Sequence, residues 1–317
     1  EFLDWFTCNK LPQEGRINLT YALSILGTIM TESTIVCLSE ESYYLVSAGA
    51  WTKYDSDYLH KSLADSKFDS VNIYDCTSQW GVFSIAGPTS RSFLKKIVVS
   101  EDPDKTLSNK EFPWLSYRDI EIGMCPVRAL RVAYTGELGW ELHHPIEMQN
   151  YLLDILLSSG KEFNLKLVGA RAQNWLRQEK SYKAFGSDLG RDAGPFESKL
   201  SRFVDINKNF LGKDALLKRK TNVSCVTLLI DGPKDIDPWG REALYNETEE
   251  VMLGRLTSAG YSVHFKRSIG IGYVKSSFSE VGTKLRIKID DAFWDAEIVQ
   301  DSPCLLYTSD AADEVSW

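Results

Sequence analysis

The pattern of the sequence changes near residue 221, and this change most constrains the fold. Before it, stretches with the alternation typical of strands are separated by stretches in which apolar residues recur with helical spacing. After it, almost no helical periodicity remains, and Gly, Asp and Pro separate short apolar stretches at 225–230, 251–256, 268–274, 284–289 and 296–299. Many short strands without helices predict a small closed β-barrel. We therefore expect one unit at residues 1–221 and a barrel at residues 222–303.

The first unit alternates pairs of strands with single helices. Strands are predicted at 16–23, 27–38, 42–48, 71–76, 80–86, 127–133 and 140–143. Helices are predicted at 53–66, 90–98, 147–163, 170–182 and 210–220. This order predicts an α+β fold of split-βαβ (ferredoxin-like) units followed by the barrel. The tail at residues 304–317 does not continue the strand pattern, so we interpret it as a non-native extension.

Composition and charge exclude several classes of partner. The formal net charge of -8 argues against a nucleic-acid-binding surface, because such surfaces concentrate Lys and Arg. The one basic run, at 213–220, follows helical spacing and is interpreted as a solvated helix end. No apolar stretch approaches the roughly 18–20 residues that span a bilayer, so no membrane partner is expected. The six cysteines are scattered without a CxxC pair, which indicates reduced thiols and no metal site.

The stretch RVAYTGELGWELHH, at 131–144, is the densest group of residues that could bind a ligand. Its glycines permit a tight turn between two strands, because glycine reaches positive φ without steric cost. Such a turn would bring Tyr134, Glu137 and Trp140 close together. A carboxylate beside aromatic faces suits a flat heterocycle rich in N–H donors. On these residues alone, an ordinary glycine hairpin with a solvated Glu is the alternative.

The motif TGELGWE resembles the TGExG(W/F)E signature of the glycine-cleavage aminomethyltransferase (T-protein) family. Other stretches resemble the family in the same order: NKLPQEGRINLT, IAGPTSR, LRQEKSYKAFGSDL, FESKLSRFV, FLGKDAL and LTSAGYSVHFKRSIGIGYV. The resemblance covers about residues 1–303. The form GELGWELH looks especially like the folate-binding C-terminal half of dimethylglycine and sarcosine dehydrogenases.

This resemblance implies a tetrahydrofolate site. Glu137 matches the family glutamate that binds the pterin ring, and Tyr134 matches the tyrosine that lines the pocket, with Trp140 following in the same motif. Arg177 matches an arginine placed to meet the folate, where an always-charged planar fork suits an anionic or carbonyl-bearing ligand. Glu197 matches a Pro-x-Glu acid that either orients the pocket or caps a helix.

The catalytic acid implied by the resemblance is Glu32. T-proteins have an Asp a few residues beyond a Gly-Gly turn, and counting from Gly27 the matching position holds Glu32. Dimethylglycine dehydrogenases resemble this chain in having Glu near this position. A carboxylate there can accept the proton released when the folate amine attacks an iminium carbon, and can stabilise the cation.

The implied function is folate-dependent one-carbon transfer. Tetrahydrofolate would capture the carbon of an oxidised N-methyl amine, such as dimethylglycine or sarcosine, as methylenetetrahydrofolate. No G-x-G-x-x-G follows a predicted strand, so FAD is expected only in a covalently linked upstream domain, and the chain is interpreted as a fragment. The expected location is cytoplasmic in a bacterium or the mitochondrial matrix in a eukaryote. The alternatives are a stand-alone aminomethyltransferase or folate-dependent demethylase, and a non-catalytic folate-binding module.

Overall fold

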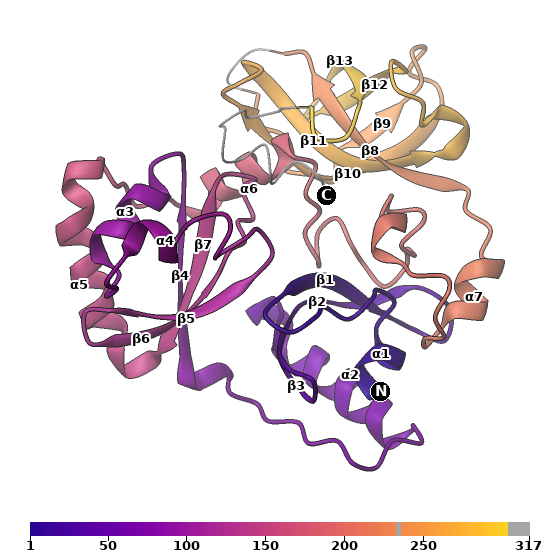
Figure 1. Ribbon diagram of the computed structural model, residues 1–317. Coiled ribbons are helices and arrows are strands. Elements are labelled where there is room, and N and C mark those ends of the chain that lie inside the picture. The colour runs from indigo at the N-terminus through magenta and orange to yellow at the C-terminus, as the bar shows by residue number, and fades with distance from the viewer. Residues whose placement is uncertain (233–235, 304–317) are drawn as a thin grey trace.

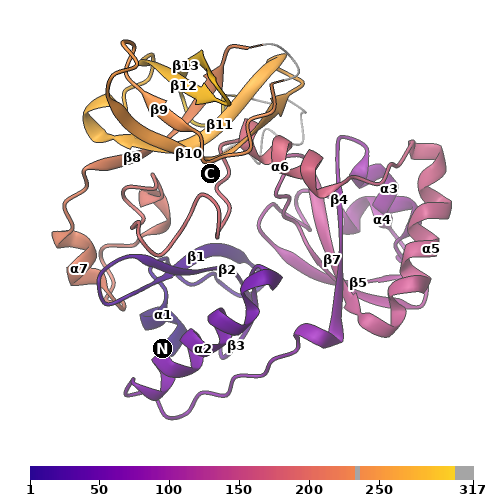
Figure 2. The ribbon, with the colours of Figure 1, turned by 180° about the vertical axis from the view of Figure 1, so that it is seen from behind.

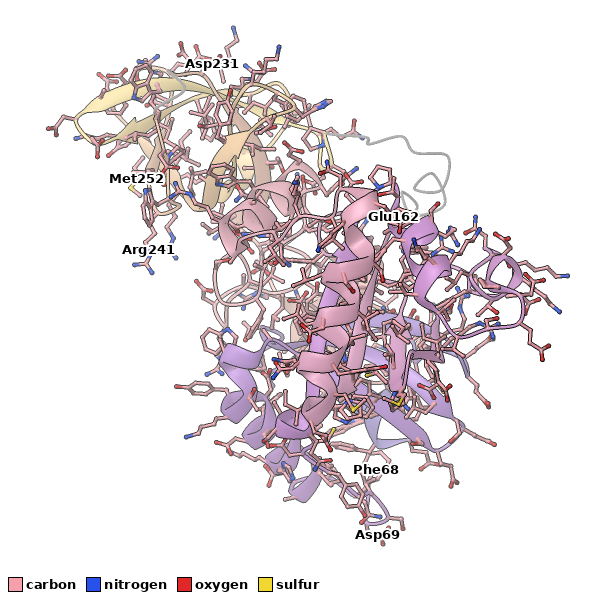
Figure 3. All side chains as sticks on the ribbon, turned by 90° about the vertical axis from the view of Figure 1, so that its left-hand side faces the viewer. Phe68, Asp69, Glu162, Asp231, Arg241 and Met252 are labelled. Atoms are coloured by element: carbon pink, nitrogen blue, oxygen red, sulfur yellow. The ribbon has the colours of Figure 1, made fainter. Side chains whose placement is uncertain are left out.

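The protein has three lobes arranged around the middle of the molecule (Figure 1). The structure is a computed structural model and describes residues 1–232 and 236–303. Seen from behind, the same three lobes surround the segment that leads from α6 toward β1 (Figure 2). In a side view, Asp231, Arg241 and Met252 lie at the barrel end of the molecule, and Phe68 and Asp69 lie at the opposite end (Figure 3).

The first lobe is a three-stranded antiparallel sheet in the order β1-β2-β3. Its elements are α1 (Phe2–Phe6), β1 (Ile17–Leu23), β2 (Ile29–Ser39), β3 (Ser42–Val46) and α2 (Thr52–Ala64). Gly27 forms the β1–β2 turn at φ +75°, and a Cβ there would lie 2.5 Å from the backbone nitrogen of Leu216 in α7 (Lys213–Lys218). Glycine is required at this turn both for its φ and for the close approach of α7.

The second lobe is a four-stranded antiparallel sheet in the order β4-β7-β6-β5. Its strands are β4 (Trp80–Ala86), β5 (Tyr117–Ile122), β6 (Cys125–Leu130) and β7 (Gly139–Pro145). Its helices are α3 (Ser90–Ile97), α4 (Pro103–Thr106) and α5 (Gln149–Gly160). The chain passes from β4 through α3 and α4 to β5, which lies at the opposite edge with β7 and β6 between. Leu94 of α3 and Leu152 of α5 are both fully buried against this sheet.

The third lobe is a closed barrel with the strand order β10-β11-β8-β13-β12-β9. Its strands are β8 (Val223–Ile230), β9 (Ala243–Tyr245), β10 (Met252–Ser262), β11 (Arg267–Lys275), β12 (Lys284–Ile289) and β13 (Ala292–Val299). Alternate residues of these strands form its core, for example Val226, Leu228 and Ile230 of β8. The predicted α+β class and C-terminal barrel are confirmed.

Short 3₁₀ helices connect several elements: Gly49–Trp51, Thr77–Gln79, Ile146–Met148, Lys161–Phe163, Ser201–Phe203 and Ser276–Phe278. No helix among residues 1–232 and 236–303 combines the length and apolar character needed to cross a membrane.

Several predicted elements differ from the structure by a few residues at their ends, and three differences are larger. The strand predicted at 71–76 is wrong, because this segment is extended but pairs with no strand among the described residues and connects the first two lobes. The three-residue strand β9 was missed because it is too short to show alternation. The helix predicted at 210–220 is confined to Lys213–Lys218. The domain boundary at residue 221 remains a prediction, and the predicted tail at 304–317 lies outside the described residues.

Candidate functional site

The site is built around the segment that follows α6 (Ala170–Glu179) and enters the middle of the molecule (Figure 1). The barrel holds α6 in place, because the indole of Trp175 occupies the space above Gly260 of β10. A Cβ at Gly260 would lie 2.0 Å from Trp175 Cδ1. This close contact places the last turn of α6, with Arg177, beside the barrel.

Arg177 is almost completely buried, at 2% exposure, and each of its three guanidinium nitrogens donates a hydrogen bond. Nη1 donates to Asp188 Oδ2 over 2.6 Å and to the Tyr182 carbonyl over 2.7 Å. Nη2 donates to Ser258 Oγ over 2.7 Å, and Nε donates to Asn174 Oδ1 over 2.9 Å. The structure therefore gives Arg177 a framework role that joins α6, the following segment and the barrel.

Glu32 lies on β2 directly opposite Tyr21 of β1. The Tyr21 hydroxyl donates to Glu32 Oε1 over 3.2 Å. Burial raises the pKa of Glu32 to about 7, and the charge of Asp188 also raises it. Hydrogen bonds from the Tyr21 hydroxyl and the Phe185 N–H lower it, as does the charge of Arg177. A carboxyl group with this pKa is partly ionised near neutral pH, so it can accept a proton and later release it.

Tyr134 lies in the loop between β6 and β7 and faces the segment after α6. Its hydroxyl donates to the Lys183 carbonyl over 3.3 Å, and its ring stacks on Tyr182 with centroids 6.5 Å apart. Burial raises the pKa of Tyr134, Arg177 lowers it, and Glu32 and Asp188 raise it further. The stack on Tyr182, whose carbonyl accepts a hydrogen bond from Arg177, places Tyr134 in the same neighbourhood as Arg177.

Glu137 lies three residues further along the same loop and is partly buried. Gly136, at φ +67°, precedes it, and a Cβ there would lie 2.5 Å from Cγ of Lys180. Burial raises the pKa of Glu137, the Lys180 charge lowers it, and the Glu179 charge raises it. The glycine thus lets the loop lie on the stem of Lys180, which holds an ammonium group near the Glu137 carboxylate.

Trp140 does not join the other predicted site residues. It is paired with Ile85 of β4, has 0% exposure, and packs edge-on against Phe112 in the core of the second lobe. The guanidinium carbons of Arg91 and Arg131 lie 5.3 and 5.9 Å from its ring centroid. The expectation that the glycine turn brings Trp140 beside Tyr134 and Glu137 is therefore corrected, because β7 has already begun and turns this side chain inward.

Glu197 is buried in a network of its own. Its Oε2 accepts from the Gly194 N–H over 2.6 Å, and its Oε1 accepts from Arg219 Nε over 2.5 Å. The Cys225 N–H also donates to the Glu197 carbonyl over 2.7 Å. These bonds tie the start of the barrel to the preceding loop, and a role of Glu197 in orienting the pocket stays a prediction.

Sequence reasoning missed Tyr21 and Asp188. The partnership of Tyr21 with Glu32 could have been found by counting back across the Gly27 turn, since register fixes which residues face each other. Asp188 lies within the stretch LRQEKSYKAFGSDL, but its pairing with Arg177 depends on the path of the chain after α6, which the sequence pattern does not specify.

Two surface cavities lie away from these residues. One, of about 610 Å³, is lined by Trp80, Asp119, Arg128 and neighbours on the second lobe. The other, of about 660 Å³, is lined by Arg171, Trp175, Tyr261 and neighbours at the start of α6. Neither lining includes Glu32, Tyr134, Glu137 or Arg177, so these two cavities are separate from the candidate site. Within the part of the chain that the structure describes, no three His, Cys, Asp or Glu side chains are grouped as a metal site requires.

The raised pKa of Glu32 predicts a pH dependence of stability. Its folded-state pKa of about 7 exceeds its ordinary value of 4.5, so the folded state binds more protons than the unfolded state between these pH values. Stability contributed by the protonated group is therefore lost as pH rises from about 4.5 to 7. Relative to Glu32→Gln, we expect the wild-type free energy of unfolding to fall by on the order of 3 kcal/mol across this window. Urea denaturation of both proteins at several pH values measures it, and parallel stability curves would contradict it.

Comparisons with known proteins agree with this architecture. Residues 1–208 match the GCVT N-terminal domain, and residues 224–303 match the Glycine cleavage T-protein C-terminal barrel domain. Mitochondrial dimethylglycine dehydrogenase of Mus musculus is 33% identical over 308 residues, which cover 95% of this chain and 34% of that protein. An aminomethyltransferase of Caldanaerobacter subterraneus subsp. tengcongensis is 26% identical over 291 residues, covering 91% of this chain and 75% of that protein.

A solved structure shares the fold. The glycine cleavage system aminomethyltransferase T of Bartonella henselae superposes with a TM-score of 0.80 at 21% identity, covering 96% of this chain and 80% of that one. The chain spans about a third of the length of the dimethylglycine dehydrogenase that it matches. The resemblance inferred from the sequence motifs is therefore confirmed.

Proposed function

Since the chain belongs to the glycine cleavage T-protein family of folate-dependent aminomethyltransferases, we propose that it binds tetrahydrofolate at Glu137 and Tyr134 and uses Glu32 in one-carbon transfer. The observation that carries this proposal is the Glu32 carboxyl group. It is bonded to Tyr21, has a pKa of about 7, and lies within electrostatic range of Tyr134.

The residues present fit a reduced pterin. Glu137 offers a partly buried acceptor, and the stacked rings of Tyr134 and Tyr182 offer an aromatic surface. Two further buried polar atoms in the same segments, Thr135 Oγ1 and Gln178 Oε1, have no hydrogen-bond partner among the described residues. Buried polar atoms are normally paired, so these unpaired atoms are consistent with a ligand that supplies partners.

The residues of the site have different roles in the proposed transfer. Bound tetrahydrofolate would supply the amine that takes up the one-carbon unit. The ionised form of Glu32 accepts a proton at its carboxylate, and its negative charge stabilises a neighbouring cation. The Tyr21 hydroxyl fixes the orientation of that carboxylate through its bond to Oε1. Arg177 acts on Glu32 through its charge while its own bonds hold the site together.

The relatives of the chain also favour a particular one-carbon donor. The similarity to dimethylglycine dehydrogenase favours an N-methyl amine, such as dimethylglycine or sarcosine, oxidised by a linked flavin domain, with the carbon captured as methylenetetrahydrofolate. FAD would then belong to the linked domain. The similarity to mitochondrial dimethylglycine and sarcosine dehydrogenases favours a mitochondrial location. A non-catalytic folate-binding module is the second candidate, because Glu32 stands where T-proteins have Asp and adds a methylene. Supplying formaldehyde to the tetrahydrofolate-bound protein separates the two, since only the enzyme accelerates product formation.

Glu137→Gln tests the binding part of the proposal. The substitution retains size but removes the charge, so we expect the Kd for tetrahydrofolate to rise about 10- to 150-fold, as for loss of a hydrogen bond to a charged group. Calorimetry under reducing conditions measures it. Glu147→Gln, which removes a charge from an exposed position on the same lobe, is the matched control and should bind as the wild type does. Absence of any heat with the wild-type protein would refute folate binding, and an unchanged Kd for Glu137→Gln would remove Glu137 from the site.

A further inference from the structure

The ion pair between Arg177 and Asp188 is almost completely buried. The two side chains are 2% and 0% exposed, and Nη1 of Arg177 lies 2.6 Å from Oδ2 of Asp188. An arginine of this burial stays charged, so the field that it exerts on its neighbours depends on how completely that charge is balanced.

Asp188 is held firmly by three elements. Its Oδ2 also accepts from the Ala184 N–H over 3.0 Å, and its Oδ1 accepts from the Thr257 hydroxyl of β10 over 2.5 Å. The Tyr273 hydroxyl of β11 donates to its carbonyl oxygen over 3.0 Å. The barrel therefore fixes the carboxylate against the guanidinium, and the Asp188 charge partly offsets the Arg177 charge at neighbouring groups.

Glu32 lies next to this pair, because it accepts a hydrogen bond from the Phe185 N–H while the N–H of the preceding residue, Ala184, donates to Asp188 Oδ2. Glu32 is therefore the group on which the charge balance acts. The Arg177 charge favours ionisation of Glu32, and the Asp188 charge opposes it. Two tyrosines also interact with Glu32: Tyr21 of β1, which bonds to it, and Tyr134, whose pKa responds to Glu32, Arg177 and Asp188. Without Asp188, Glu32 would face an uncompensated cation.

We propose that Asp188 is a positioning residue of the one-carbon transfer site, which balances the charge of Arg177 beside the Glu32 carboxyl group. The inference rests on the proposed role of Glu32 as the proton acceptor. Asp188 acts through Arg177 and needs no contact with the ligand. A merely structural Asp188 would influence folding but would leave the titration of Glu32 unchanged.

The experiment is a titration of the Glu32 carboxyl carbon by NMR in the ligand-free protein labelled with ¹³C-glutamate, with the signal assigned from Glu32→Gln. Asp188→Asn should lower the pKa of Glu32 by about one unit, because a nearby opposite charge shifts a carboxyl pKa by 1–3 units. The double variant Arg177→Met/Asp188→Asn removes both charges and should return the pKa close to the wild-type value. Arg177→Met alone removes the positive charge and should raise the pKa of Glu32. This variant provides the test if Asp188→Asn does not fold.

Asp301→Asn is the matched control. It removes a carboxylate from Lys183, a buried cation of the same segment, whose Nζ lies 3.4 Å from Asp301 Oδ2. The charged side chains that act on Glu32 are Arg177 and Asp188, so this control should leave the Glu32 pKa in place. A wild-type Glu32 titration in folded Asp188→Asn, or a shift of equal size in Asp301→Asn, would overturn the inference.

The NMR readout needs no folate and no turnover, so it separates this inference from the proposed function. If Glu32 shifts as expected and transfer is active, the pH at which the transfer rate falls on the acid side should move down by the same amount in Asp188→Asn. A shift of the Glu32 signal without a shift of the rate profile would overturn the link to transfer.

Discussion

Glu32→Gln is expected to lower the rate of one-carbon transfer by about 10²- to 10⁴-fold, which is the contribution typical of a positioned general base. Glutamine keeps the length of the side chain and can still accept the bond from Tyr21, but it cannot take up a proton. The affinity for tetrahydrofolate should change little, because the proposed pterin contacts lie on Glu137 and Tyr134. Single-turnover formation of product from formaldehyde and tetrahydrofolate, together with calorimetry, measures both quantities.

The control for this variant is Glu40→Gln, which removes a carboxylate from the exposed turn after β2. It should transfer at the wild-type rate. The wild-type rate should itself fall as pH drops below about 7, because Glu32 becomes protonated there, and Glu32→Gln should lose this dependence. Wild-type transfer by Glu32→Gln would exclude Glu32 as the proton acceptor and would favour the non-catalytic folate-binding module if folate still bound.

Local periodicity was enough to predict most strands and the barrel. Val226, Leu228 and Ile230 alternate with the period of a strand, and all three face the barrel core. Gly27 lies at the boundary between the strands predicted at 16–23 and 27–38, and the structure explains the glycine there by its positive φ and its contact with Leu216. Where a segment has no partner, as at 71–76, its β-propensity alone predicted a strand that the fold does not form.

The candidate site was predictable only in part because its contacts connect distant segments. The motif around Glu137 and the count from Gly27 to Glu32 are local, so both residues could be singled out from the sequence. The bond between Arg177 and Ser258 spans 81 residues, and no spacing rule foretells it. Trp140 shows the opposite failure: proximity in sequence to Glu137 suggested a shared site, but strand alternation turns the ring into the core.

Arg177→Met is expected to lower the free energy of unfolding by about 3–5 kcal/mol, the cost of breaking a buried ion pair from one side. Methionine fills similar space but leaves the Asp188 carboxylate buried without its cation, and it also removes the bonds to Asn174, Tyr182 and Ser258. Urea denaturation followed by tryptophan fluorescence measures the change, since the chain has 9 tryptophans and Trp175 lies on the same helix.

Two further variants test whether the loss of stability is specific to the buried ion pair. In Arg177→Met/Asp188→Asn the stranded charge is gone, so the loss of stability should be smaller than in Arg177→Met alone. Arg267→Met breaks a pair with Asp231 in which both side chains are substantially exposed, and it should cost at most about 1 kcal/mol. Equal losses for Arg177→Met and Arg267→Met would show that the guanidinium of Arg177 contributes no more than a surface charge, and the view that it joins α6 to the barrel would have to be abandoned.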